Sequence, residues 1–183
     1  MNTGPSNHGW LRKWLRREPH QIIGGKDSPY LLRWYVIPRN KVVNVYLHKF
    51  LRSDDDRALH DHPWWFISLI LKGGYTEVTE NARTARSGLL GGRYRGWDRT
   101  VAFRPATFRH RVELWPAVEH VNPFITRRDR RELPCWTLIV TGPRTRLWGF
   151  WCKDRFGETR SRQYEVDRFI PWDEFGDAGC GER

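Results

Sequence analysis

The chain has 183 residues, the length of one domain, and it is 39% hydrophobic and 29% charged, which excludes a highly charged disordered chain. Its longest apolar run, residues 64–71, is too short to span a bilayer, so we expect no membrane association. The N-terminus has no apolar stretch of the signal-peptide type, and the three cysteines form no CxxC pair. We therefore expect a cytoplasmic protein whose cysteines are reduced thiols.

The net charge of +11 is unevenly distributed along the chain. Residues 83–111 contain eight arginines, no lysine and the single acid Asp98, for a net charge of +7. A concentrated positive field attracts anions, so this segment favours an anionic ligand. The alternative is a solvated outer face whose arginines pair with acids such as Glu113. A second run, residues 127–131, has four arginines in five positions, and we expect a surface loop there.

The first predicted element is a short helix that follows a loose tail at residues 1–9. Apolar residues recur at helical spacing between basic ones, namely Trp10, Leu11, Trp14 and Leu15. Pro19 ends the pattern. We expect residues 1–28 to form an N-terminal tail and a basic amphipathic helix that covers the domain as a lid. Contact with a membrane surface or a nucleic acid is the alternative.

From residue 29 the pattern changes to short segments rich in β-branched and aromatic residues. Nine of them predict strands: Leu31–Ile37, Val42–Phe50, Trp64–Leu71, Tyr75–Thr79, Thr100–Phe103, Arg109–Trp115, Trp136–Thr141, Arg146–Trp151 and Gln163–Val166. Gly73-Gly74 indicates a hairpin turn between two of them. Strands at this even spacing predict an all-β closed barrel or jelly roll over residues 29–175, followed by a flexible tail at 176–183.

The strongest local chemical signal is His60-Asp61-His62. Alternate residues of a strand point to one face, so the two imidazoles would converge as two metal ligands must. The alternative is a pair of polar residues at the entrance of a strand. Further along, a turn that contains Pro105 precedes His110, a third histidine at the start of another predicted strand.

This arrangement resembles the two metal-binding motifs of the cupin superfamily, which are His-x-His followed by a strand and a Gly turn, and then Pro-x-Gly-x-x-His. The matching positions are His60, His62, Gly73-Gly74, Pro105 and His110. Thr107 stands where the second motif usually has Gly. The resemblance implies a cupin-like jelly-roll barrel in which the three histidines bind one divalent metal. It also implies a homodimer paired through edge strands.

The Glu that usually follows the first cupin motif is missing, because Phe66 and Ile67 occupy its place. Three neutral imidazoles leave a divalent ion its full charge and open positions, which is similar to the three-His iron site of thiol dioxygenases within the cupins. His48 and Glu77 are candidates for a fourth ligand, and the choice between them stays open. Imidazole suits several metals; we favour Fe(II), with Zn, Mn or Ni as alternatives.

Together these features predict a metal-dependent cupin enzyme, and we favour a non-haem iron oxygenase acting on a small anionic substrate whose charge Arg104 neutralises. The same site with another metal would serve an isomerase or a lyase. The rival class is a non-enzymatic nucleic-acid-binding module. Eleven tryptophans among many arginines are also typical of grooves that bind single-stranded nucleic acid.

Overall fold

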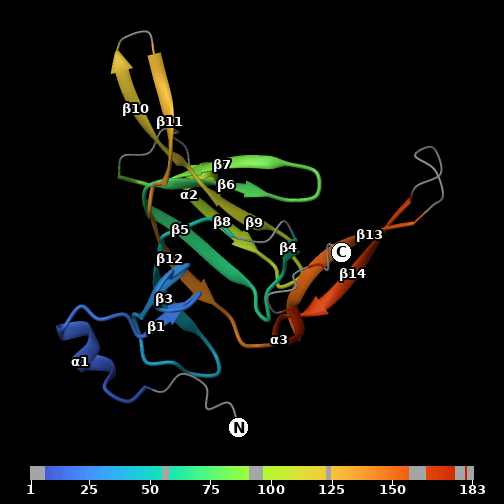
Figure 1. Cartoon of the computed structure of the whole chain (residues 1–183). Coiled ribbons are helices and arrows are strands. Elements are labelled where there is room, and N and C mark those ends of the chain that lie inside the picture. The colour runs from blue at the N-terminus through green and yellow to red at the C-terminus, as the bar shows by residue number, and fades with distance from the viewer. Residues whose placement is uncertain are drawn as a thin grey trace.

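The computed structural model describes residues 7–54, 58–90, 97–122, 125–156, 164–175 and 180. These residues form antiparallel β-sheets with three short helices (Figure 1). The largest sheet has the order β1 (Gln21–Ile23), β2 (Leu31–Tyr35), β3 (Asn44–Phe50), β12 (Cys135–Thr141), β5 (Phe66–Lys72) and β8 (Val101–Arg104). The predicted all-β class is confirmed, and each of the nine predicted strands overlaps an observed one.

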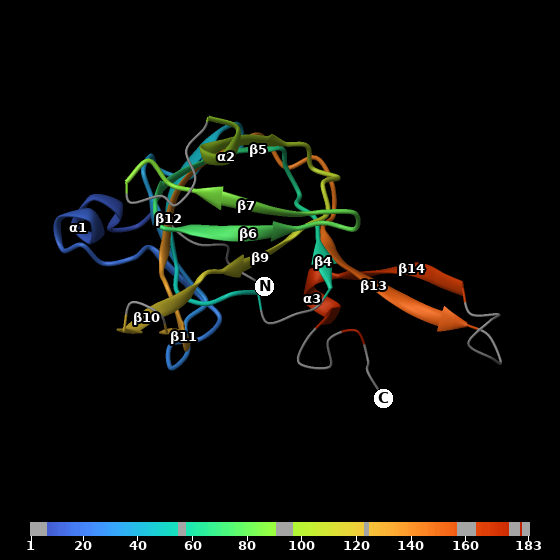
Figure 2. The ribbon, with the colours of Figure 1, turned by 90° about the horizontal axis from the view of Figure 1, so that it is seen from above.

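Three smaller sheets complete the fold. The first contains β7 (Arg83–Ser87), β6 (Gly74–Val78) and β9 (Arg111–Leu114), and the second contains β14 (Tyr164–Pro171), β13 (Gly149–Phe156) and β4 (Leu59–His60). The third is a two-stranded ribbon of β10 (Pro116–Asn122) and β11 (Ile125–Glu132). This ribbon and the β13–β14 pair project away from the rest of the fold (Figures 1 and 2).

The hydrophobic core lies where the β6 sheet packs against the six-stranded sheet. Its buried members come from both sheets: Ile70, Tyr75, Val112, Leu114 and Cys135, with Phe50 packed against them. Strand alternation produces this core, because every second residue of β5, β12 and β9 points inward. Other inward positions are polar, among them His48, Ser68, Glu77 and Thr137.

The predicted N-terminal helix is α1 (Trp10–Leu15), and it lies against β2. The indole Nε1 atoms of Trp10 and Trp14 both donate to the backbone oxygen of Tyr35, at 2.7 and 2.6 Å. The imidazole of His20 stacks on the Tyr35 ring with 4.9 Å between the ring centroids. These contacts place α1 as a cover over the end of β2. No helix in the described part of the chain is both long and apolar enough to cross a membrane.

The expectation of a hairpin at Gly73-Gly74 is wrong. β5 pairs with β12 and β8, whereas β6 pairs with β7 and β9, so the two glycines are a corner at which the chain passes from one sheet to the other. Gly73 has a φ of 81°, and a Cβ there would lie 2.7 Å from the backbone oxygen of Pro134. Glycine is therefore required by both conformation and space.

The expectation of a loop at residues 127–131 is also wrong, because this run lies within β11. β11 pairs with β10 in an antiparallel ribbon that includes the partners Glu119 and Arg127. Pairing with a neighbouring strand outweighed the weak strand preference of its charged residues.

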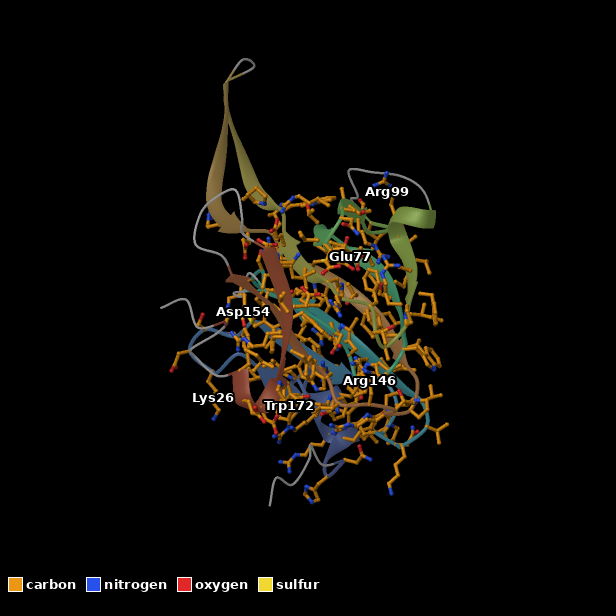
Figure 3. The ribbon with its side chains drawn as sticks, turned by 90° about the vertical axis from the view of Figure 1, so that its right-hand side faces the viewer. Lys26, Glu77, Arg99, Arg146, Asp154 and Trp172 are labelled. Carbon is orange, nitrogen blue, oxygen red and sulfur yellow. A yellow bond between two sulfur atoms is a disulfide. The ribbon has the colours of Figure 1, made fainter. Side chains whose placement is uncertain are left out.

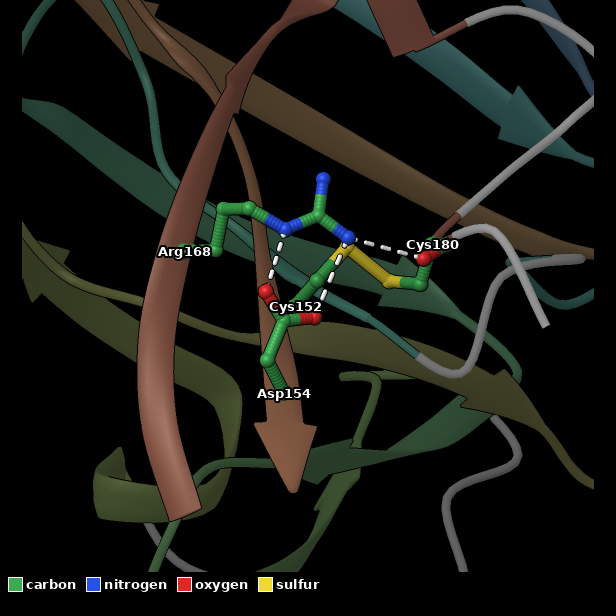
Figure 4. Close-up of a disulfide and its surroundings, with 4 residues drawn as sticks. All are labelled: Cys152, Asp154, Arg168 and Cys180. Carbon is green, nitrogen blue, oxygen red and sulfur yellow. Dashed lines mark hydrogen bonds and ion pairs between the residues drawn. A yellow bond between two sulfur atoms is a disulfide. The ribbon is translucent and has the colours of Figure 1, made fainter. Parts of the chain in front are cut away.

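The prediction that all three cysteines are reduced is wrong for two of them. Cys152 on β13 forms a disulfide with Cys180 (Figure 4). Cys135 remains a free buried thiol. Arg168 strengthens the junction, since its Nη2 donates to the backbone oxygen of Cys180 at 2.9 Å and its Nε donates to Asp154 at 2.6 Å. The separation of 28 residues in the sequence did not indicate the pairing, which depends on Cys180 lying beside β13 in the folded chain.

We expect the disulfide to contribute about 3–4 kcal/mol to the free energy of unfolding, because it closes a loop of 28 residues in the unfolded chain. A dithiol reductant should therefore lower the unfolding midpoint of the wild-type protein in urea. The variant Cys152→Ser should start at the lower midpoint and show no further response. Equal responses of both proteins to the reductant would contradict the pairing.

Candidate metal centre

The three predicted histidines come from two segments that the backbone holds side by side. The amide of His60 donates to the carbonyl of His110 at 2.9 Å, and the amide of His110 donates back to the carbonyl of His60 at 3.0 Å. The amide of His62 donates to the carbonyl of Ala106 at 3.1 Å. β4 is thereby fixed against the segment that leads into β9, which brings His110 beside the His-x-His pair.

The three side chains converge. The ligating nitrogens of His60, His62 and His110 all lie within 4.8 Å of one another. The Nε2 atoms of His62 and His110 are 2.9 Å apart, and the ring centroids of the three pairs are separated by 5.0–5.2 Å. The meeting of these rings is what the motif spacing predicts, and their role as ligands remains a prediction.

Burial keeps two of these imidazoles neutral. Desolvation lowers the pKa of His60 from 6.5 to about 4, although the nearby Asp54 carboxylate acts in the opposite direction. Desolvation, reinforced by the charges of His60 and His110, places the pKa of His62 well below its ordinary value. Both rings therefore carry the free lone pair that metal ligation requires at neutral pH.

Glu77 lies on β6 (Figure 3). Its carboxylate contacts His110 and is not one of the grouped ligand atoms. Its Oε1 is 2.9 Å from Nδ1 of His110, and its side chain is 2% exposed. Burial alone would raise the pKa of this carboxyl group, but hydrogen bonds from His110 and Arg104 outweigh it and lower the pKa to about 2. An ionised Glu77 accepts a hydrogen bond from the protonated Nδ1 of His110. The lone pair with which His110 could bind a metal is therefore on Nε2.

Arg104 was predicted to neutralise the substrate, and the structure directs its guanidinium to Glu77. Both its Nε and its Nη2 donate to this carboxylate, and the guanidinium lies 4.4 Å from the centroid of the Phe108 ring. Its charge is therefore already compensated inside the protein. The substrate role of Arg104 stays a prediction, and its observed contact is with the residue that orients His110.

His48, the other candidate fourth ligand, lies outside the group of three. It is buried on β3, and its Nε2 accepts a hydrogen bond from Nε of Arg33 at 2.8 Å. Its ring stacks on Tyr46 with 5.8 Å between centroids. The lone pair that would bind a metal is thus occupied by an arginine.

Two further carboxylates, those of Asp54 and Asp61, support the site. Oδ2 of Asp54 lies 3.7 Å from Nδ1 of His60 and accepts a hydrogen bond from the amide of Val112 at 2.6 Å. Asp61, between the two histidines of the motif, was given no role. Strand alternation could have indicated that it faces away from them, because residues i and i+1 point to opposite faces.

Asp61 fastens β4 to β13. Its carboxylate is 1% exposed and accepts the backbone amide of Gly149 at 3.0 Å, Nε1 of Trp151 at 3.0 Å and Nη1 of Arg146 at 2.5 Å. A buried carboxylate with this many donors is fully compensated. It fixes the backbone from which both neighbouring imidazoles project.

Aromatic side chains enclose the three imidazoles. Phe66 lies 4.7 Å from His62 and Phe108 lies 5.4 Å from His110, measured between ring centroids. Phe150 lies 6.0 Å from His60. These rings form an apolar wall beside the imidazoles and lower the local dielectric constant.

A second aromatic layer comes from α3 (Trp172–Phe175). Phe175 stacks on Phe150 with 3.8 Å between centroids, and Trp172 stacks on Trp148 at 5.8 Å. Trp148 in turn lies parallel to the ring of His62 at 6.5 Å. The C-terminal helix therefore packs behind two of the three imidazoles.

The arginine-rich segment 83–111 is largely compensated where the structure describes its side chains. The ion pairs are Arg83 and Arg111 with Glu113, Arg86 and Arg104 with Glu77, and Arg109 with Asp167 and Glu80. Pairing with Glu113 was the alternative considered from the sequence. Residues 91–96, including two of the arginines, lie outside the described part.

The geometry fits a divalent metal ion. Metal–nitrogen bonds of about 2.1 Å place two neighbouring ligands roughly 3–3.4 Å apart, close to the 2.9 Å between Nε2 of His62 and His110. His110 is held by Glu77 in the tautomer that ligation needs, as metal-binding histidines usually are. The residues present therefore match an imidazole site for Zn, Fe, Mn or Ni.

No family model matches this chain, and no curated protein matches it. Among solved structures it is similar to an uncharacterized conserved protein with a double-stranded β-helix domain from Klebsiella pneumoniae subsp. pneumoniae, at 13% identity over 70% of this chain and 90% of that one, with a TM-score of 0.43. It is also similar to an RmlC-like cupin family protein from Methanocaldococcus jannaschii, at 10% identity over 68% and 90% of the two chains, with a TM-score of 0.37. It is similar as well to KdgF from Halomonas sp., at 14% identity over 68% of this chain and 94% of that one, with a TM-score of 0.41. These likenesses concern the fold alone.

We expect the buried histidines to make the metal-free protein acid-sensitive. Because burial lowers the pKa of His60 from 6.5 to about 4, the unfolded state binds protons before the folded state does. The contribution of the neutral His60 to stability is complete above pH 6.5 and is lost as the pH falls toward 4. This loss lowers the free energy of unfolding by about 3 kcal/mol. Urea unfolding of the wild type and of His60→Gln across this range tests it. Identical slopes in the two proteins would contradict the assignment.

Proposed function

We propose that this chain is a metal-dependent enzyme acting on a small anionic substrate, with His60, His62 and His110 holding one divalent ion. The observation that carries the proposal is the convergence of three imidazole nitrogens, with no carboxylate from the described residues among them. Fe(II) is the favoured ion and non-haem oxygenase chemistry the favoured reaction. The bound ion would supply Lewis-acid or dioxygen-activating chemistry at this place.

Neutral ligands support an anionic substrate. The three imidazoles contribute no negative charge, so the +2 charge of an ion at this place is not offset by its protein ligands. The nearest carboxylates, Glu77 and Asp54, are engaged on the far sides of His110 and His60. An anion from the substrate would balance the charge in an environment of low dielectric constant.

The supporting residues set the geometry before anything binds. Glu77 fixes the tautomer of His110, and Asp54 lies against the corresponding nitrogen of His60. Asp61 anchors the strand that carries His60 and His62. The phenylalanine rings beside them lower the local dielectric constant, which favours a preorganised small-molecule site over an open binding surface.

Metal content tests the proposal directly. We expect about one divalent ion per wild-type chain by elemental analysis, and loss of the ion in His62→Ala. Glu77→Gln should retain the fold and bind the ion about 10–100-fold more weakly, because a neutral amide holds His110 less firmly. Lys49→Gln, on the outer face of β3, is the matched control and should bind normally. Absence of metal from the wild type after loading would overturn the proposal.

The choice among reactions depends on reconstitution. For an oxygenase, oxygen uptake with small carboxylic acids should stop on chelation and return with Fe(II) but not with Zn. Return with Zn or Mn and no oxygen uptake would assign an isomerase or lyase. Binding of single-stranded nucleic acid that survives chelation and falls steeply with salt would instead support a nucleic-acid-binding module.

A further inference from the structure

A second hydrophobic cluster lies beside the metal centre, where β13, β14 and α3 meet. Its buried members are Ala58, Cys152 and Phe175, and the partly buried Phe150, Ile170 and Cys180 pack against them. Ala58 immediately precedes β4, and Phe150 on β13 is the backbone partner of His60 on β4. The cluster therefore supports the short strand that presents the first imidazole.

This cluster is too small to hold α3 in place by packing alone. Three of its described side chains are buried, and a core of this size usually needs a cross-link. α3 has four residues, far fewer than a helix needs to persist by itself in water. The pairing of β14 with β13 ends at Pro171, before α3 begins. The position of α3 therefore depends on contacts made by its side chains and by the chain that follows it.

Aromatic contacts connect α3 to the wall of the metal centre. Phe175 stacks on Phe150, and Trp172 stacks on Trp148. Phe150 and Trp148 in turn lie against the two imidazoles of the His-x-His motif. Because Trp172 is 40% exposed, α3 is the outermost of these aromatic layers. Displacement of α3 would uncover one face of Phe150 and one face of Trp148, and both rings would then be free to move.

The disulfide attaches the chain on the far side of α3. Cys180, five residues after the last residue of α3, is bonded to Cys152 on β13 (Figure 4). The carbonyl of Cys180 also accepts a hydrogen bond from Arg168, but this contact is exposed to solvent. α3 is therefore held from both sides, by the pairing of β14 with β13 before it and by the cross-link after it.

The two bonded cysteines differ in exposure. Cys152 is 1% exposed, whereas Cys180 is half-buried, so the thiolate of a dithiol reductant can attack Sγ of Cys180. The S–S bond breaks, and Cys152 leaves as a thiolate that takes up a proton. The second thiol of the reductant then displaces Cys180 from the mixed disulfide. Two electrons and two protons pass to the protein, and the dithiol becomes a disulfide.

We propose that the Cys152–Cys180 disulfide is a redox switch for the metal centre: its reduction by a dithiol releases α3 and opens the aromatic wall beside His60 and His62. The oxidised protein keeps this wall closed, and the reduced protein exposes the two imidazoles to solvent and to competing ligands. Control of metal binding by the switch rests on the function proposed above, whereas the opening of the wall is a property of the chain without metal.

Chemical modification of the imidazoles in metal-free protein tests the opening. Diethyl pyrocarbonate modifies accessible neutral histidines, and peptide mass spectrometry gives the rate at each one. In wild-type protein that is reduced but retains its circular dichroism, we expect His60 and His62 to react at least about fivefold faster, because a local opening exposes them. His48 is buried on β3, in a different sheet from β13 and β14, and should react at an unchanged rate.

Three variants distinguish this opening from a general loss of stability. Cys180→Ser should react fast without reductant and show no response to it. Phe175→Ala keeps the disulfide but removes the ring that stacks on Phe150, so His60 should react fast in the oxidised protein as well. Cys135→Ala removes the third cysteine of the chain, is the matched control, and should respond to the reductant as the wild type does.

Extraction of a bound ion gives a second measurement. From protein loaded with Zn, a chelator should remove the ion faster after reduction, by a factor similar to the change in the modification rates. If the wild type binds no ion, the proposed function fails, and the modification rates still decide the opening. Unchanged rates at His60 and His62 after reduction, an equal increase at His48, a persistent response in Cys180→Ser, or equal extraction rates from the two states of loaded protein would each overturn the redox switch.

Discussion

The two backbone hydrogen bonds between His60 and His110 are the constraint on which the candidate metal centre depends. They join segments of the chain that are 50 residues apart and hold them at strand spacing. Everything else at the site refines this juxtaposition. Asp61 ties the same short strand to β13, so the His-x-His pair is fixed from both sides.

Charge compensation organises the interior around that pair. The carboxylate of Glu77 contacts His110 and Arg104, and it lies 3.8 Å from Arg86. It stays ionised despite its burial because hydrogen bonds from His110 and Arg104 stabilise its charge. Asp61 is satisfied in the same way. The carboxylates of Glu77 and Asp61 thus orient side chains and backbone amides of the protein. This leaves the three imidazoles as the only converging ligand atoms in the described residues.

Aromatic packing supplies the remaining property of the site, an apolar wall beside the imidazoles. Phenylalanines from several strands contact the imidazoles, and α3 adds Phe175 and Trp172 behind them. The many tryptophans of the sequence are explained here mainly as packing. Trp10 and Trp14 attach α1 to β2, Trp148 and Trp172 stack together, and Trp151 donates to Asp61.

The sequence by itself determined the all-β class, the approximate positions of nine strands, the N-terminal helix and the three histidines that meet. Each of these follows from local periodicity or from motif spacing, which the chain carries in its order of residues. The tertiary structure alone decided that Gly73-Gly74 is a corner between sheets, that Cys152 meets Cys180, and that Glu77 and Arg104 pair behind His110. It also decided that His48 binds Arg33. These contacts join residues from different strands, and their partners are fixed by sheet order and register, which no local pattern encodes.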